Sequence, residues 1–474
     1  MGIKYDLVVI GGGSGGLSAA AGAARFGAKV ALVEKHKLGG ECLWTGCVPS
    51  KALIKSAKVA HLINNAEAFG LEKQKVVVKL EKVMAHVENV IKKIEPHDSP
   101  GRFKSLGVDV FFGSPSFKDK NTLMVNGQEL RAKSFIIATG SQPFRLPVPG
   151  LEEVGYLTNE TLFEKRALPK TLLVIGGGPI GVEMAQAFRR LGSEVVIFER
   201  GSHLLGKEDA DVALVLEGVF EREGIKILKD LELVKVEKKE RKKIVHITQK
   251  GKKMSVGGDE ILLAVGRTPN VEGLNLDVIG VKYDKRKIFV NDRLQTSVSN
   301  IYAVGDVKGK FLFTHMAGYE AGVALTNILF KLPVKADYGV VPWTTFTDPE
   351  IARVGFSEQE LKERNVSCSV LKYPLEDVDR AQTDMEAVGF VKLLVDKSAR
   401  ILGAHIVGAN AGEMLPEFVL AMKKKLKVTD IFRTIHVYPT LGMANQLVAG
   451  KFYEKKLTER VKRLLQVVFG FGSK

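Results

Sequence analysis

The chain has 474 residues, of which 45% are hydrophobic and 26% charged, a composition typical of globular proteins with about three domains. No apolar run reaches the roughly 18 residues needed to cross a bilayer, which excludes a membrane-spanning protein. The net charge of +16 favours an anionic partner but does not choose between dinucleotide phosphates, nucleic acid and a lipid surface. Three cysteines are too few for a secreted disulfide framework, and the chain starts without a cationic leader, so we expect a cytoplasmic protein.

A strand, a glycine-rich turn, a small-residue helix and a second strand are expected in succession over residues 5–34. Gly11 permits a tight turn, Gly13 lets the backbone approach a pyrophosphate, and Gly16 lets the helix pack closely on the strand. Glu34 lies where an acid binds an adenosine ribose. This complete βαβ unit predicts a dinucleotide site.

Two cysteines, Cys42 and Cys47, follow this unit and are separated by four residues. In a continuous helix their Cα atoms would lie roughly 7.5 Å apart, beyond the about 7 Å that a disulfide spans. The backbone around Gly46 must therefore be distorted if the sulfurs bond. Pro49 suits a first helical turn, so Cys47 is expected near a helix N-terminus, where partial positive charge favours the thiolate. We interpret the pair as a redox switch; the alternative is two separate buried thiols.

The βαβ pattern recurs over residues 172–199. Gly176, Gly178 and Gly181 repeat the three glycines, and Glu199 repeats the acid at the same distance of 18 positions from the third glycine. The economical inference is two different dinucleotides in separate domains. The alternative is that one copy is a degenerate structural unit.

Two further segments, residues 135–143 and 261–270, share one design: a buried strand that ends in a glycine turn and leads the chain from one domain to the next. A third strand, residues 301–304, ends just before a carboxylate, where ligands of open α/β sheets bind. The cofactor contacts expected in these segments are Thr139, Gly140, Gly266 and Asp306.

Strand-like runs at residues 389–395 and 401–407, with a helix near residues 412–426, indicate an α+β domain at the C-terminus. The sequence thus predicts an α/β fold with two Rossmann-like dinucleotide-binding domains and a C-terminal α+β domain. The expected parts are a first dinucleotide-binding domain with the cysteine pair (1–149), a second dinucleotide-binding domain (150–270), a second part of the first domain (271–340), the α+β domain (341–450) and a basic tail (451–474).

The tail is expected to form a basic amphipathic helix, in which apolar residues recur at helical spacing and basic residues lie elsewhere on the wheel. The apolar residues are Leu457, Val461, Leu464, Leu465 and Val468, and the basic ones are Lys455, Lys456, Arg460, Lys462 and Arg463. One interpretation is a helix docked on a dimer. The other is peripheral attachment to an anionic membrane at its inner face, favoured by Phe469 and Phe471.

Four motifs stand in order around the two glycine fingerprints: GGECLWTGCVPSK, ATGSQP, AVGRTPN and YAVGD. Together they closely resemble the flavin-dependent pyridine nucleotide-disulfide oxidoreductases over about residues 3–450. The resemblance implies FAD in the first site, NAD(P)H in the second and a homodimer built on the C-terminal domain. It also implies that Asp306 binds the ribityl chain of FAD and that Ala317 lies in a segment that packs on the flavin.

The same resemblance implies roles for the thiols and two charged residues. Cys47 matches the flavin-proximal thiol, and Cys42 matches the distal thiol that exchanges with substrate. Lys51 and Glu183 match an ion pair near the flavin and the nicotinamide. The implied route passes two electrons from the nicotinamide through the flavin to the disulfide, and from the dithiol to an acceptor.

The sequence departs from the family at residues 436–443. The family's dithiol enzymes resemble HxHPTxxE here, with a His as acid–base partner of the distal thiol and a Glu that orients it, whereas this chain has Tyr438 and Met443. His436 matches only the first His. Tyrosine, with an unperturbed pKa near 10, is a poor base at neutral pH, which disfavours dihydrolipoamide dehydrogenase and glutathione reductase. Tyrosine at this position resembles the mercuric reductase branch, although the last residues lack the cysteine pair that this branch normally adds.

The leading hypothesis is an NADH-dependent FAD oxidoreductase that passes electrons to a metal ion such as Hg(II), a disulfide or a quinone-like acceptor. Its alternatives are a dihydrolipoamide dehydrogenase with a replaced base and a non-catalytic scaffold or nucleic-acid-binding flavoprotein. The intact fingerprints argue against the last class and make nucleic acid an unexpected partner. Glu199 favours NADH, while Arg200 leaves NADPH as the alternative. The expected catalytic residues are Cys42, Cys47, Lys51, Glu183 and Tyr438, and no residues are assigned to a resident metal.

Overall fold

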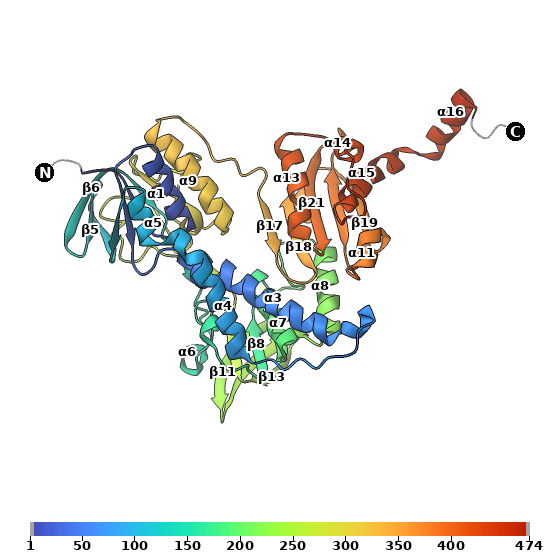
Figure 1. The fold of residues 1–474 in the computed structure, drawn as a ribbon, viewed down its shortest axis with the longest axis horizontal. Coiled ribbons are helices and arrows are strands. Elements are labelled where there is room, and N and C mark those ends of the chain that lie inside the picture. The colour runs from blue at the N-terminus through green and yellow to red at the C-terminus, as the bar shows by residue number, and fades with distance from the viewer. Residues whose placement is uncertain (1–3, 471–474) are drawn as a thin grey trace. The chain divides into compact units, whose positions relative to one another are not determined.

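The computed structural model describes residues 4–470 (Figure 1). It divides into two compact units. The first comprises Met1–Arg200 and Asp230–Asp337, and the second comprises Gly201–Lys229 and Tyr338–Lys474. The two units are described separately.

A seven-stranded sheet forms the centre of the first unit, with the strand order β3-β2-β1-β6-β5-β4 and with β16 beside β6. Strands β3, β2, β1, β6 and β16 are parallel, and β5 and β4 add an antiparallel edge. Their bounds are β1 Tyr5–Ile10, β2 Val30–Glu34, β3 Val108–Phe112, β4 Pro115–Asp119, β5 Thr122–Val125, β6 Gln128–Ile137 and β16 Ile301–Ala303. The apolar runs of β1 and β6 are buried, as parallel strands covered on both faces require.

Two helices of this unit pack closely on one another: α1 (Ser14–Arg25) and α9 (Thr314–Leu329) (Figure 1). The small residues of α1 permit this approach, since a Cβ on Gly22 would lie 2.7 Å from a methyl group of Leu325. The expected strand–turn–helix–strand unit at the N-terminus is therefore present. Its second strand is Val30–Glu34.

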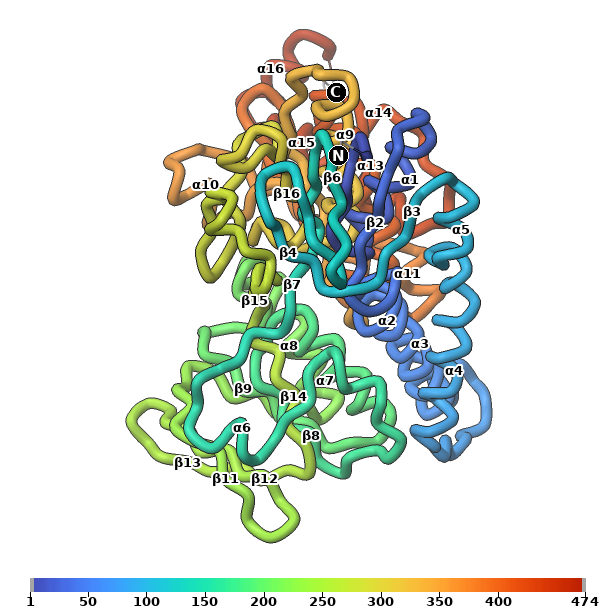
Figure 2. The backbone as a smooth tube through the Cα atoms, turned by 90° about the vertical axis from the view of Figure 1, so that its left-hand side faces the viewer, coloured from blue at the N-terminus to red at the C-terminus, as the bar shows by residue number. Residues whose placement is uncertain are grey.

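The second glycine fingerprint lies in a smaller parallel arrangement of the same unit, in which β8 pairs with β9 and with β14. Three antiparallel strands follow side by side (Figure 2), and β7 pairs with β15 to form a two-stranded ribbon. The bounds are β7 Ser141–Pro143, β8 Thr171–Ile175, β9 Glu194–Phe198, β11 Leu231–Lys239, β12 Lys242–Gln249, β13 Lys252–Gly258, β14 Glu260–Leu263 and β15 Arg267–Pro269. The lysines of residues 235–253, on β11 to β13 and their turns, are exposed apart from Lys243.

The remaining helices of this unit connect these sheets. They are α2 Gly40–Trp44, α3 Cys47–Asn64, α4 Leu80–Ile94, α5 Pro100–Ser105, α6 Leu151–Val154 and α7 Pro179–Leu191. Helix α3 packs on α4 and on α7, and through α7 it reaches the second fingerprint.

The second unit is built on an antiparallel sheet with the strand order β17-β18-β21-β20-β19. Its strands are β17 Pro342–Thr345, β18 Glu350–Gly355, β19 Ser369–Pro374, β20 Phe390–Val395 and β21 Ile401–Gly408, with β10 Lys226–Leu228 in the earlier segment. Its helices are α8 Ala210–Arg222, α10 Glu358–Glu363, α11 Asp379–Thr383, α12 Ala411–Met414, α13 Pro416–Lys423, α14 Val428–Arg433, α15 Met443–Lys456 and α16 Glu459–Phe469. The expected helix near residues 412–426 is two helices, because Pro416 lacks the N–H needed to continue α12 and instead starts α13.

The expectation of one amphipathic helix through the tail is wrong in detail. Helix α15 continues to Lys456, and Leu457 and Thr458 separate it from α16. The Thr458 hydroxyl accepts the Val461 N–H and so caps a new helix. Leu457 therefore lies outside the apolar stripe, and Phe471 lies outside the described residues.

The fold is thus α/β, with glycine fingerprints on parallel strands and an antiparallel C-terminal sheet. Among the described residues, no helix combines the length and apolar character needed to cross a membrane.

Candidate active site

The two glycine turns of the first unit repeat one another in geometry. Gly11 and Gly176 have φ of 105° and 107°, and a Cβ at either would lie 2.4 Å from a carbonyl oxygen of the adjacent strand end. A Cβ on Gly16 would lie 1.8 Å from the Gly11 oxygen, and one on Gly181 would lie 2.0 Å from the Gly176 oxygen. The fold itself therefore requires glycine at these four positions.

The middle glycines behave differently, because no protein atom crowds them. A Cβ on Gly13 would meet only the Gly40 Cα at 3.7 Å, and one on Gly178 would meet nothing within 4 Å. These residues are the N-caps of α1 and α7, where backbone N–H groups face outward. Open space before a helix N-terminus fits a pyrophosphate, so both turns are suited to a dinucleotide.

An acid lies beside each turn. Glu34 accepts a hydrogen bond from the Gly12 N–H at 2.6 Å, and Glu199 accepts one from the Gly177 N–H at 2.7 Å. The two carboxylates are therefore held in equivalent places at the ends of β2 and β9. Their role as ribose ligands stays a prediction.

The cysteine segment contains the break that the spacing of the thiols requires. Helix α2 ends at Trp44, Thr45 and Gly46 have non-helical backbone angles, and α3 begins at Cys47. Cys47 is thus the first residue of an 18-residue helix, as expected from Pro49. Both cysteines are free thiols in this structure, with Cys47 exposed and Cys42 partly buried.

The two thiols differ strongly in acidity. Hydrogen bonding from Cys42 is the largest cause that lowers the pKa of Cys47 to about 6; burial opposes it, while the Thr314 hydroxyl and the Lys51 ammonium reinforce it. The Thr314 Oγ1 lies 3.6 Å from the Cys47 sulfur. The same contact with Cys47, together with burial, raises the pKa of Cys42. Cys47 is therefore the more acidic thiol of the pair, and Cys42 the one that holds its proton more tightly.

Lys51 lies one helical turn after Cys47 on α3, and its Nζ donates to Glu183 Oε2 at 2.9 Å. Glu183, on α7, is buried, with a side chain only 7% exposed. The expected contact between these two residues is present in the structure. Its role at the cofactors stays a prediction.

The remaining expected cofactor contacts also lie in the first unit. The Asp306 carboxylate accepts from the Ser141 hydroxyl at 2.7 Å, and the Thr139 hydroxyl donates to the Asn270 carbonyl at 2.6 Å. Gly140 and Gly266 have positive φ, with no atom within 4 Å of an added Cβ. Ala317 on α9 is buried, and its Cβ lies 3.4 Å from a Cβ built on Gly15.

Three residues beside the thiols were missed from the sequence: Glu41, Arg267 and Asn159. The Arg267 guanidinium pairs with the Glu41 carboxylate, to which the Asn159 amide also donates at 2.9 Å. Burial raises the pKa of Glu41 to about 7, against the opposing pull of Arg267. Glu41 and Arg267 stand inside the motifs GGECLWTGCVPSK and AVGRTPN, which could have revealed them; Asn159 carries no comparable signal.

Tyr438 belongs to the second unit and is exposed there. Its hydroxyl donates to Asp379 at 2.8 Å, and this hydrogen bond raises the pKa of Tyr438 above its usual value. Tyr438 and Met443, the two departures from the family pattern, line one pocket of about 230 Å³ together with Asp379. A phenol with a raised pKa is a still poorer base at neutral pH.

His436 is held by contacts within the second unit. Its Nε2 lies 2.9 Å from the Glu417 carboxylate, and its Nδ1 lies 2.9 Å from the Thr434 carbonyl. The Asn445 amide holds the other Glu417 oxygen at 2.9 Å. With both ring nitrogens engaged by acceptors, the ring is fixed within its own unit.

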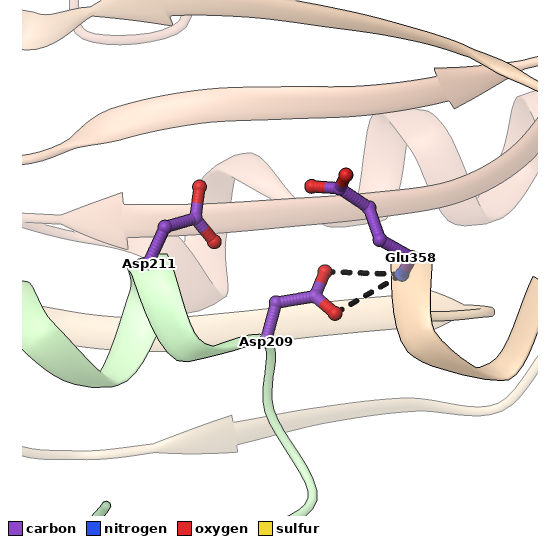
Figure 3. Close-up of side chains that lie close together, drawn as sticks. All are labelled: Asp209, Asp211 and Glu358. Carbon is purple, nitrogen blue, oxygen red and sulfur yellow. Dashed lines mark hydrogen bonds between the residues drawn. The ribbon is translucent and has the colours of Figure 1, made fainter. Parts of the chain in front are cut away.

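Three carboxylates of the second unit, Asp209, Asp211 and Glu358, lie close enough to hold a cation (Figure 3). The fully buried Lys392 ammonium already lies among them, 2.8 Å, 2.7 Å and 2.9 Å from their oxygens. Asp209 also accepts the Glu358 backbone N–H at 3.0 Å, at the start of α10. The place of a cation among the three carboxylates is therefore taken by the Lys392 ammonium.

Two protein-family descriptions together match most of the chain. The family described as pyridine nucleotide-disulphide oxidoreductase matches residues 5–321, and its dimerisation domain matches residues 341–447. The chain belongs to this family. It is therefore an oxidoreductase of a family that uses FAD and NAD(P)H, and its second unit contains a dimerisation domain.

Curated relatives within the pyridine nucleotide-disulphide oxidoreductases carry two names. A mercuric reductase of Lysinibacillus sphaericus is 36% identical over 451 residues, covering 95% of this chain and 83% of the relative. A dihydrolipoyl dehydrogenase of Thermus scotoductus is 39% identical over 442 residues, covering 92% and 95%. Among solved structures, the Cu(II) complex of the HOCl-induced flavoprotein disulfide reductase RclA from Escherichia coli has a TM-score of 0.85 at 26% identity, covering 95% of this chain and 99% of that one.

Proposed function

We propose that this protein is an NADH-dependent flavoprotein reductase whose Cys42–Cys47 pair passes two electrons to a soft metal ion. The observation that carries the proposal is the combination of a thiolate–thiol pair in the first unit with Tyr438 where a base would be needed for thiol exchange. FAD, when bound, accepts a hydride from the nicotinamide and returns two electrons to the disulfide.

Individual residues of the chain have separate roles in binding the cofactors and in the chemistry of the thiols. The open faces of Gly13 and Gly178 receive the two pyrophosphates. Cys47, at the start of α3, holds negative charge after reduction, while Cys42 keeps its proton until substrate arrives. Lys51 favours the thiolate, and Glu183 holds Lys51 in place.

A soft metal ion suits this pair better than a disulfide substrate. Thiolates prefer soft cations, and a metal ion that takes up electrons needs no proton delivered to a sulfur leaving group. A disulfide substrate releases a thiolate that benefits from a nearby acid. Relatives named mercuric reductase and a neighbour crystallised with Cu(II) support this choice of acceptor.

The main alternative is a dihydrolipoyl dehydrogenase with a replaced base. A relative of that name with 39% identity favours it, while Tyr438 and Met443 disfavour it. A non-catalytic scaffold is the weaker alternative, because both fingerprints and both thiols are present.

Anaerobic enzyme reduced with NADH is the test. Hg(II), Cu(II), lipoamide and a soluble quinone are added in separate samples, and reoxidation is followed by flavin absorbance. Fast reoxidation by a metal ion, lost in Cys42→Ser and kept in Cys368→Ser, supports the proposal; the control replaces the thiol of the second unit. Faster reoxidation by lipoamide than by either metal ion contradicts it.

We further propose that the protein works as a homodimer and binds anionic membranes peripherally through α16. This helix has no buried residue, and its apolar side chains are exposed, including Leu464 at 61% and Val468 at 61%. On the helical wheel, Arg460 and Lys462 flank the stripe formed by Val461, Leu464, Leu465 and Val468. Basic residues at both edges of an apolar stripe suit a helix lying in an anionic interface.

A further inference from the structure

Glu41, the residue before Cys42, has no part in the proposed electron route, yet it is tied into the structure around the thiols. Its carboxylate pairs with the Arg267 guanidinium and accepts from the Asn159 amide at 2.9 Å. These partners lie 226 and 118 positions away in the sequence. The start of α2 is therefore held by distant parts of the first unit.

Arg267 carries this connection to the ribbon formed by β7 and β15. Its side chain is 10% exposed, and it donates to the Ser141 hydroxyl at 2.7 Å and to the Ser141 carbonyl at 2.9 Å. The Ser141 hydroxyl in turn donates to Asp306 at 2.7 Å. The Arg267 guanidinium thus connects α2, which carries Cys42, to the Asp306 carboxylate, which is expected at the flavin site.

Asn159 holds the other end of α2. Besides contacting Glu41, its amide donates to the Thr45 carbonyl at 3.3 Å. Thr45 is where α2 ends and the chain turns to place Cys47 at the start of α3. The same amide therefore contacts both the side chain before Cys42 and the backbone before Cys47.

We propose that Glu41 is a positioning residue for the redox pair: held by Arg267 and Asn159, it keeps α2 and the break at Thr45 and Gly46 in the arrangement that places Cys47 at the start of α3, next to Cys42. The inference rests on the proposed redox role of the two thiols. A partly buried ion pair contributes little net stability, because desolvation offsets the attraction, so a geometric role explains it better than a stabilising one.

Substitution of Glu41 distinguishes a positioning role from a purely electrostatic one, because the two roles predict different changes in the Cys47 titration. If Glu41 acted by its charge alone, Glu41→Gln with unchanged geometry would leave the Cys47 titration unchanged where Glu41 is already protonated, and would lower the pKa of Cys47 where Glu41 is charged. Loss of positioning removes the hydrogen bond from Cys42, the largest cause of the low pKa, and leaves less thiolate. The direction of the change therefore separates the two explanations.

The experiment uses the FAD-loaded enzyme reduced by two electrons. Alkylation of Cys47 by iodoacetamide is followed against pH by mass spectrometry, and the long-wavelength band of a thiolate beside oxidised flavin is followed in parallel. Glu41→Gln is expected to reduce the thiolate at least tenfold at pH 6. The matched control is Glu129→Gln, which breaks an exposed ion pair with Lys118. It is expected to leave the Cys47 titration and the long-wavelength band unchanged.

Asn159→Ala provides a second variant, because it removes both amide contacts without changing any charge. It is expected to change the thiolate in the same direction and decides the question if Glu41→Gln does not fold. More thiolate, or an unchanged titration, in the folded variants overturns the inference. Absence of the band in the unmodified enzyme counts instead against the proposed role of the thiols.

Discussion

The Lys51 Nζ lies 2.9 Å from the Glu183 Oε2, and this ion pair joins residues 132 positions apart. Lys51 belongs to α3, which begins with Cys47, and Glu183 belongs to α7, which begins beside the second glycine turn. The ion pair therefore connects α3, which begins with Cys47, to the helix that follows the second glycine turn, within the first unit. Neither side chain could be assigned to the other by sequence spacing alone.

The two thiols are expected to respond differently to replacement. Reduction by two electrons should produce a long-wavelength band from the Cys47 thiolate beside oxidised flavin. Cys47→Ser should abolish the band, because it removes the group with the low pKa. Cys42→Ser has no disulfide to reduce, so it should show the band before NADH is added and lose it when the flavin is reduced. Anaerobic titration with NADH, monitored by absorbance, checks this, and the reverse pattern would show that the roles are exchanged.

The band should also depend on pH. The pKa of Cys47 is lowered to about 6, so the thiolate is present above that value and is lost as the pH falls through it. Thr314→Val removes the hydroxyl near the sulfur and should move the midpoint to higher pH, whereas Thr314→Ser should not. Band intensity measured from pH 5 to 9 tests both statements; a midpoint near the ordinary value in the unmodified enzyme contradicts them.

The enzyme should prefer NADH to NADPH. The Glu199 carboxylate, held by the Gly177 N–H, can bind a ribose 2′-hydroxyl and repels a 2′-phosphate. Glu199→Gln should reduce the ratio of kcat/KM for NADH to kcat/KM for NADPH at least tenfold. The matched change Glu194→Gln, at the other end of β9, should have little effect on this ratio. A higher kcat/KM for NADPH in the unmodified enzyme would refute the assignment.

Dihydrolipoamide should be a weak substrate. Tyr438→His with Met443→Glu would place a base and an orienting carboxylate on one pocket and should raise this activity by about tenfold or more, in the range of general-base effects. The double variant is compared with each single one under steady-state conditions. Efficient turnover of dihydrolipoamide by the unmodified protein would make dihydrolipoyl dehydrogenase the better assignment.

The tail should bind anionic vesicles. Residues from Lys451 onward contain seven basic and two acidic residues, and each basic residue near an anionic leaflet contributes about 1 kcal/mol. Binding should weaken with salt, and Leu464→Glu with Val468→Glu should remove the part that resists salt. Co-sedimentation compares the full chain with one ending at Leu457, which keeps α15 and removes α16. Equal sedimentation of both chains, or none by the full chain at low salt, supports a helix docked on the dimer.

The sequence alone determined the local elements of the site. Gly11, Gly16 and their counterparts in the second fingerprint were predictable because a tight turn and close helix packing exclude any Cβ, and this demand is visible in the residue types. The position of Cys47 at a helix N-terminus was predictable for a similar reason, since Pro49 and the spacing of the thiols constrain only nearby backbone.

The tertiary structure decided the contacts between distant segments. Arg267, Asn159 and Glu41 meet because β15, the segment before β8 and α2 are brought together by the fold, and no periodicity in the sequence records such a meeting. The same holds for Lys392 among its three carboxylates. Hydrogen bonds and ion pairs depend on angles and distances that only packing sets, whereas turns and caps depend on the backbone preferences of single residues.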